Sequence, residues 1–242
     1  MKTLKFLLLL FIVALQGCAS CPPKDYRAYA EHMPASIVVL PPINESAEVK
    51  ASDAFLSTVT RFIAEDGYYV FPVALVDQHM KENGVTVPGE MHAINPRKFR
   101  EIYGADAVLY IHVKEWTTTY VVIDSTTKVT LSYRLVDTDT GTEFWTQQAT
   151  YAHSSSAGQT DLIAMAVLAT ARAIASAVVD LETEVARYTN GLAFNDPSTG
   201  LIKGQRHPQY EQAKLDLENR IRAIEEWEQK EAEKEAEKQD KV

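Results

Sequence analysis

The sequence has 242 residues, of which 46% are hydrophobic and 24% are charged, and its formal net charge is −9. An acidic protein repels nucleic acid and anionic lipid headgroups, so we expect no nucleic-acid partner. Only two cysteines are present, which excludes a fold held together by several disulfides.

The first predicted element is an export signal. Lys2 and Lys5 precede an unbroken apolar run at residues 6–15, the order in which signal peptides arrange their basic and apolar regions. A membrane-spanning helix needs about 20 apolar residues, so this run is too short to cross a bilayer.

A lipid-attachment motif follows. Gly17 directly precedes Cys18, and Leu15 lies three positions upstream of that cysteine, which resembles a bacterial lipobox. We predict that residues 1–17 are removed as a signal peptide and that Cys18 is acylated, because Cys21 has no aliphatic residue three positions upstream. Two or more acyl chains make such an anchor durable, at about 0.8 kcal/mol per buried methylene. An ordinary signal peptide that leaves both cysteines in a short loop is the alternative.

The surrounding residues indicate where the anchor lies. Ala19 rather than an aspartate follows Cys18, and lipoproteins of this pattern pass to the outer membrane, so we predict its periplasmic face. Loss of Lys2 and Lys5 with the signal peptide would shift the formal net charge from −9 to −11. Cys21 would then have no intramolecular partner, so it either pairs between chains or stays free or modified.

A tether is predicted at residues 18–35. Residues 22–34 are polar, begin and end with proline and show no apolar period. If flexible, these thirteen residues span about 20 Å on average. The folded part is therefore expected to stand just clear of the bilayer.

A single α/β domain is predicted at residues 36–210. The apolar run at residues 37–40 ends at Pro41 and Pro42, which indicates a strand buried on both faces. A helix is predicted at residues 51–67, with four apolar residues on one face: Phe55, Val59, Phe62 and Ile63.

Strands and helices continue to alternate after this helix. A short strand is predicted at residues 68–73, and helices are predicted at residues 74–84 and 95–104, each closed by a glycine. This order favours parallel pairing of the first strands.

The second half favours antiparallel strands. A long strand is predicted at residues 106–116 and another strand at residues 117–125. A strand at residues 129–136 is predicted to pair, through a turn at residues 137–142, with residues 143–151. The alternation in the middle strand predicts one dry face, formed by Val129, Leu131, Tyr133 and Leu135, and one wetter face, formed by Thr130, Ser132 and Arg134.

Two helical stretches close the chain. Residues 161–188 predict a long, alanine-rich helix, with Gly191 just past its end; we favour burial against the sheet, with an oligomer interface or membrane contact as alternatives. Arg172 in its middle argues against insertion into a bilayer. Residues 211–242 predict a charged tail, and Leu217, Ile221 and Ile224 leave open a short partner helix or coiled-coil segment.

No catalytic or metal-binding signature is found. The acidic turn at residues 137–142 lacks two ligands of a calcium loop, and the six histidines do not follow zinc spacing. His112 alternates with apolar neighbours, so we expect it to lie on a strand face rather than to bind a metal. His153 adjoins serines, but no nucleophile elbow is present. We therefore predict no catalytic residue, no metal site and no cofactor.

One candidate site remains, directly after the first buried strand. Pro41 and Pro42 fix the path of the chain, and Asn44, Glu45 and Ser46 follow at the carboxyl end of the strand. Ligands of open α/β sheets bind at such edges, so we predict that these five residues bind a partner or ligand.

Several motifs carry a family resemblance. "SIVVLPPINES", "AEDGYYVFPVALVD", "FREIYGADAVLYIHV", "LVDTDTGTEFW" and "GQRHPQY" occur in this order. They resemble a family of outer-membrane lipoproteins of unknown function that includes a genome-derived vaccine antigen. The resemblance implies a three-layer domain similar to the amino-terminal domain of TolB, with helices packed on a mixed sheet, and related to curli-type secretion lipoproteins. It assigns no catalytic residue.

Together these features favour a lipid-anchored, non-enzymatic protein on the periplasmic face of the outer membrane. We expect it to dock or assemble with other envelope lipoproteins, with a secretion channel or with copies of itself. A binding module for peptidoglycan or another envelope ligand is the first alternative. An enzyme of unrecognised type is the second.

Overall fold

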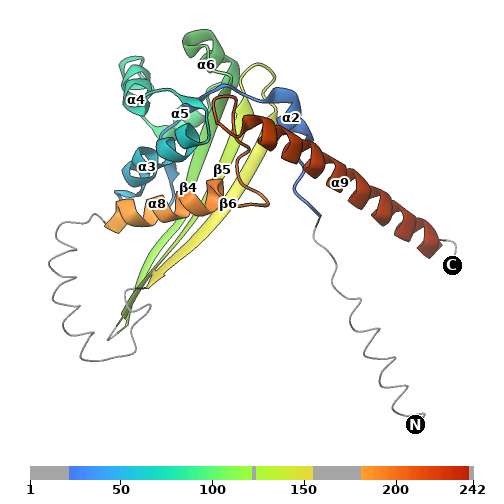
Figure 1. Ribbon diagram of the computed structural model, residues 1–242. Helices are drawn as coiled ribbons and strands as arrows, with labels where there is room; N and C mark the ends of the chain where they lie inside the picture. Colours follow the sequence, from blue (N-terminus) through green and yellow to red (C-terminus); the bar gives the residue numbers. More distant parts are fainter. Residues whose placement is uncertain (1–21, 122–123, 155–180, 240–242) are drawn as a thin grey trace.

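The computed structural model describes residues 22–121, 124–154 and 181–239. They form a mixed sheet with helices packed on both of its faces (Figure 1). The predicted mixed α/β class is confirmed.

The elements follow one another in this order: α2 (Arg27–His32), β1 (Ser36–Val39), β2 (Ile43–Asn44), α3 (Ala51–Glu65), β3 (Tyr69–Val70), α4 (Val73–Glu82), α5 (Pro88–His92), α6 (Pro96–Tyr103), β4 (Ala107–Val121), β5 (Asp124–Asp137), β6 (Glu143–Ser154), α8 (Leu181–Phe194) and α9 (Tyr210–Gln239). The predicted helices at residues 51–67, 74–84 and 95–104 correspond to α3, α4 and α6.

The sheet combines parallel and antiparallel pairing. Its strand order is β3-β1-β4-β5-β6, and β2 pairs with β4 further along that strand. Strand β1 runs parallel to both β3 and β4, whereas β4, β5 and β6 form an antiparallel meander. Both predicted pairing styles are confirmed.

Strands β1 and β4 are buried on both faces. On one face, Ile37 and Leu109 join the larger core beneath α2, α3 and α8. On the other face, Val38 and Val108 join a smaller core beneath α4, α5 and α6. Burial on both faces explains the continuous apolar run of the first strand.

Strand β5 is covered along one face, whereas among the described side chains of its other face only Thr130, 9% exposed, and Val136, in the smaller core, are buried. Val129, Leu131, Tyr133 and Leu135 lie in the larger core, as their alternation predicts. Arg134 is exposed and Ser132 is half-buried on the opposite face. Figure 1 shows α4, α5 and α6 gathered over β1 and the beginning of β4, which leaves the β5 and β6 side of this face open.

The strand predicted at residues 117–125 is wrong as a separate element. Residues 117–121 continue β4, and residues 124–125 begin β5. A bulge between Val113 and Glu115 lets β4 shift register without ending, and no turn residue separates Trp116 from Thr117.

The prediction of a flexible tether is wrong for residues 24–33. Tyr26 and Tyr29 are each only 1% exposed, and α2 packs against β6. The average polarity of this stretch concealed two aromatic side chains, three residues apart, that anchor it to the larger core. Cys18 and Cys21 lie outside the described residues.

Of the predicted helix at residues 161–188, the first twenty residues lie outside the described part. Helix α8 covers the rest and packs between α3 and β6. It continues to Phe194, so the predicted end before Gly191 is wrong. A β-carbon at Gly191 would lie 3.5 Å from the Phe62 ring, an ordinary van der Waals distance, so this glycine does not have to end the helix. No helix within the described ranges is long and apolar enough to cross a membrane.

Helix α9 begins at the predicted boundary of the domain, but its first half packs on the body. Leu217 and Ile224 are 2% and 5% exposed. An ion pair joins Arg27 of α2 to Glu228 of α9, with 2.8 Å between Nη2 and Oε1. The C-terminal part of α9 projects from the body (Figure 1).

We predict that Leu217→Ala lowers the free energy of unfolding by about 2–5 kcal/mol, because it removes buried methyl groups and leaves a cavity. Leu215→Ala is the matched control, since Leu215 is 54% exposed on the same helix; it should change the free energy by less than about 0.5 kcal/mol. Chemical denaturation monitored by circular dichroism measures both. Equal effects of the two substitutions would show that α9 does not pack through Leu217.

Candidate functional site

The predicted site begins where the chain leaves β1. Pro41 and Pro42 are buried. Ile43 and Asn44 then pair with His112 and Val113 as strand β2, so this stretch is partly sheet rather than a free loop. The pairing places the following residues beside the part of the sheet face that α4, α5 and α6 leave uncovered.

Asn44 and Ser46 shape a turn toward α3. Asn44 Nδ2 donates to the carbonyl oxygen of Glu48 at 2.7 Å, and Asn44 Oδ1 accepts hydrogen bonds from the backbone nitrogen of Ser46 at 3.0 Å and its hydroxyl at 2.7 Å. These polar groups satisfy each other. Of the five predicted residues, Glu45 is the exposed one whose charged group faces a neighbouring strand.

Glu45 and His112 meet on this uncovered part of the sheet face. The backbone nitrogen of Glu45 donates to the carbonyl oxygen of Val113 at 3.0 Å, and Glu45 Oε1 lies 3.0 Å from His112 Nε2. Nε2 is shielded from solvent and has no well-aligned hydrogen-bond partner among the described residues. His112 thus lies on a strand face, as its alternation predicts.

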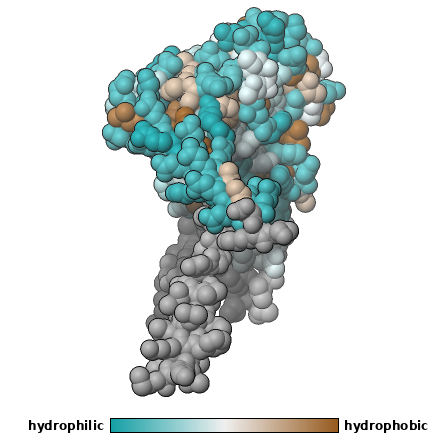
Figure 2. All heavy atoms as spheres, turned by 90° about the vertical axis from the view of Figure 1, so that its right-hand side faces the viewer, coloured by the Kyte–Doolittle hydropathy of each residue, from teal (hydrophilic) through white to brown (hydrophobic). Residues whose placement is uncertain are grey.

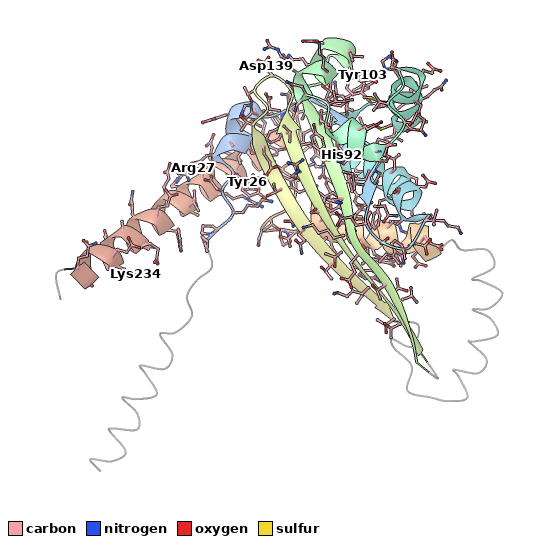
Figure 3. All side chains as sticks on the ribbon, turned by 180° about the vertical axis from the view of Figure 1, so that it is seen from behind. Tyr26, Arg27, His92, Tyr103, Asp139 and Lys234 are labelled. Carbon is pink, nitrogen blue, oxygen red and sulfur yellow. The ribbon has the colours of Figure 1, made fainter. Side chains whose placement is uncertain are left out.

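His92 enters the site from α5, a helix that the sequence did not indicate. Its Nε2 donates to the carbonyl oxygen of Pro41 at 2.9 Å, and its ring meets the Tyr110 ring edge-on at 5.2 Å. Figure 3 shows His92 between α5 and the strands. Burial lowers the pKa of His92; the hydrogen bond to Pro41 opposes this change, and positive charge on His112 and Arg134 adds to it.

An open depression of about 510 Å³ lies beside His92. The Arg134 guanidinium stands 5.1 Å above the centre of the Tyr110 ring and 3.2 Å from Glu143 Oε2. Burial raises the pKa of Tyr110. Arg134, Tyr110 and Glu143 come from three different strands, so their meeting depends on the register of the sheet.

The acidic turn and the histidines of the sequence can now be located in the structure. Within residues 22–121, 124–154 and 181–239, no three potential metal-ligating side chains converge. In the acidic turn, Asp137 Oδ1 accepts from the backbone nitrogens of Asp139 at 3.0 Å and Thr140 at 2.7 Å, which is the predicted hairpin turn. The side chain of His153 and residues 155–158 of its serine-rich stretch lie outside the described part.

The fold and this site define a mixed α/β domain with one sheet face covered by helices and an open, polar area on the other. The chain belongs to a lipoprotein family: the family described as "Putative lipoprotein GNA1162-like" matches residues 24–206. The match begins at Lys24, close to the residue where the chain joins the folded body. The family resemblance of the sequence motifs is therefore confirmed.

The chain is also similar to individual proteins and solved structures. The "Putative lipoprotein NMB1124/NMB1162" of Neisseria meningitidis serogroup B is 38% identical over 201 residues, which cover 81% of this chain and 92% of the relative. The crystal structure of lipoprotein GNA1162 from Neisseria meningitidis is 42% identical, covers 59% of this chain and 99% of that one, and gives a TM-score of 0.49. A PelC dodecamer from Paraburkholderia phytofirmans is 14% identical, covers 71% and 89%, and gives a TM-score of 0.40.

We predict that His92→Gln weakens the pH dependence of stability. The pKa of His92 lies below its ordinary value of 6.5, so the unfolded chain binds this proton more readily than the folded one. The stability that neutral His92 confers is fully present above about pH 6.5 and decreases as the pH falls through and below that value.

Glutamine retains a donor for the Pro41 carbonyl but does not titrate. Urea denaturation of both proteins at about pH 7.5 and about pH 5 measures the difference. The free energy of unfolding should fall less in the variant. An equal fall in both proteins would mean that protonation of His92 does not oppose folding.

Proposed function

We propose that lipid on Cys18 holds this protein at the periplasmic face of the outer membrane, where its domain docks another envelope component without catalysing a reaction. The partner is a neighbouring lipoprotein, a secretion channel or a second copy of the chain. Membership of a lipoprotein family and the lipobox-like motif at residues 15–18 support the anchor.

The open, polar half of the sheet carries the docking part of the proposal. We call this surface the open face and define it by Glu45, His112, Glu115, Lys128, Ser132, Arg134, Glu143 and Gln148. Its ionisable side chains lie in acid–base pairs: Glu45 with His112 at 3.0 Å, Glu115 with Lys128 at 2.9 Å, and Arg134 with Glu143 at 3.2 Å.

Paired charges on a rigid sheet suit recognition of another protein. A partner with complementary charges can exchange these exposed pairs for intermolecular ones, which gives specificity and orientation more than affinity. A lipid anchor raises the effective concentration of the domain near other membrane-bound proteins, so weak contacts on this face are sufficient.

A second candidate is binding of an envelope glycan such as peptidoglycan. The depression beside His92 favours it, because Arg134 and Asn95 line the depression and can contact carboxylates and hydroxyls. Sedimentation of the purified protein with isolated sacculi separates the two functions. Binding that Glu45→Lys leaves unchanged and Arg134→Ala abolishes would favour the glycan.

We predict that Cys18→Ser releases the protein from membranes. The parent should stay in the membrane fraction after a high-salt wash, because acyl chains hold it by burial of methylenes rather than by charge. Cys21→Ser is the matched control and should also stay. An intact mass without lipid, or release of the parent by salt, would disprove the anchor.

We predict that a photo-crosslinking amino acid at Gln148, on the open face, captures a specific envelope protein in intact cells. The same group at Gln78, exposed on α4, is the control and should capture no such partner. Mass spectrometry identifies the product. Glu45→Lys should reduce the Gln148 product several-fold, and equal capture from both positions would argue against docking through the open face.

A further inference from the structure

The chain joins the folded body only a few residues after the cysteine that we propose to be lipidated. Lys24 Nζ donates to the carbonyl oxygen of Thr199 at 2.8 Å and also contacts the carbonyl oxygen of Thr146. The same nitrogen lies 4.8 Å above the Trp145 ring. Burial lowers the pKa of Lys24 to about 8. These contacts hold Lys24 as part of the domain.

The next residues strengthen this attachment. The Tyr26 hydroxyl donates to the carbonyl oxygen of Gly200 at 2.7 Å, and the Arg220 guanidinium of α9 stands 5.1 Å above the centre of the Tyr26 ring. Arg220 also donates to the carbonyl oxygens of Pro197 at 2.6 Å and Ser198 at 2.9 Å. The entry point is therefore built from α2, residues 196–200 and the first half of α9.

Covalent geometry then limits how far this entry point can lie from a lipid on Cys18. Six residue steps separate Cys18 from Lys24, and a fully extended chain advances at most about 3.3–3.6 Å per residue, or roughly 20 Å in total. A flexible segment of this length averages only about 12–15 Å. At that distance the domain cannot rotate freely relative to the bilayer, because the domain is wider than the tether is long.

We propose that the surface formed by Lys24, α2, residues 196–200 and the first half of α9, the anchor face, rests against the headgroups of the bilayer. This inference rests on the proposed lipid at Cys18. Figure 3 shows Tyr26 and Arg27 on one side of the molecule and Tyr103 of α6 on the other. Helices α4 and α6 thus point away from the membrane.

The chemistry of the anchor face suits neutral, zwitterionic headgroups. Arg27 is paired with Asp25 and Glu228, and the first half of α9, residues 210–224, contains three acidic and three basic residues. Figure 2, which views the molecule from the side of α9, shows mainly hydrophilic side chains and only separate apolar patches. The anchor face therefore lies on the bilayer without inserting, and anionic lipid does not strengthen the contact.

Fluorescence quenching in vesicles tests this orientation. The full-length, lipidated protein with Cys21→Ser is placed in phosphatidylcholine and phosphatidylethanolamine vesicles that contain a headgroup nitroxide lipid. One fluorophore is attached at Ser198→Cys, on the anchor face, or at Lys98→Cys, exposed on α6. We expect several-fold stronger quenching at position 198.

A longer tether provides the matched control. In the same Cys21→Ser protein, twenty Gly and Ser residues are inserted between positions 21 and 22. This insertion should leave the protein on the vesicles but remove most of the difference in quenching between positions 198 and 98. Equal quenching at both positions of the parent, or a difference that the insertion does not reduce, would overturn the orientation. Failure of the parent to sediment with vesicles would instead overturn the anchor, and with it the basis of the inference.

Discussion

Burial of strand β4 on both faces is the constraint on which the rest of the structure depends. Its odd-numbered residues from Ala107 to Val113 lie in the larger core, and Val108 and Tyr110 lie in the smaller one. The strand also separates two pairing styles, since it is parallel to β1 and antiparallel to β5. A shift of one residue in β4 would exchange its two faces and disrupt both cores at once.

The two faces of the sheet then differ in how far helices cover them and in the side chains that they present. The face beneath α3 and α8 is sealed along β5 by Val129, Leu131, Tyr133 and Leu135, so it supplies stability. The opposite face is covered only where α4, α5 and α6 reach it, and the remainder presents paired charges on strands that cannot bend independently. Rigid support of exposed polar groups is what a recognition surface requires.

Patterns with a local cause could be predicted from the sequence. The alternation at residues 129–135 predicts one dry face because neighbouring side chains of a strand point in opposite directions. The end of α6 at Gly104 is predictable because a helix often ends at a residue with positive φ, a conformation that favours glycine. Gly104 has a φ of 71°. Helix α2 was missed because its burial depends on two tyrosines in a polar stretch. The packing of α9 was missed because its apolar seam is short.

The candidate site shows the same division between local and distant causes. The sequence indicated the position of residues 41–46 at the end of a buried strand but not their roles, because Asn44 and Ser46 satisfy each other within the turn. The meeting of Glu45 with His112 depends on the pairing of β2 with β4. His92 comes from a five-residue helix and reaches Pro41 across 51 residues of sequence. No local pattern encodes such contacts.

The attachment of Lys24 and Tyr26 has a mechanical consequence. Any pull on the amino terminus acts first on the Lys24 contacts with Trp145 and Thr199, and next on the Tyr26 hydroxyl and the Arg220 guanidinium. Because Trp145 and Thr146 belong to β6, the edge strand of the sheet, such a pull is passed directly to the sheet. The contacts of Tyr26 share the load with residues 196–200 and α9.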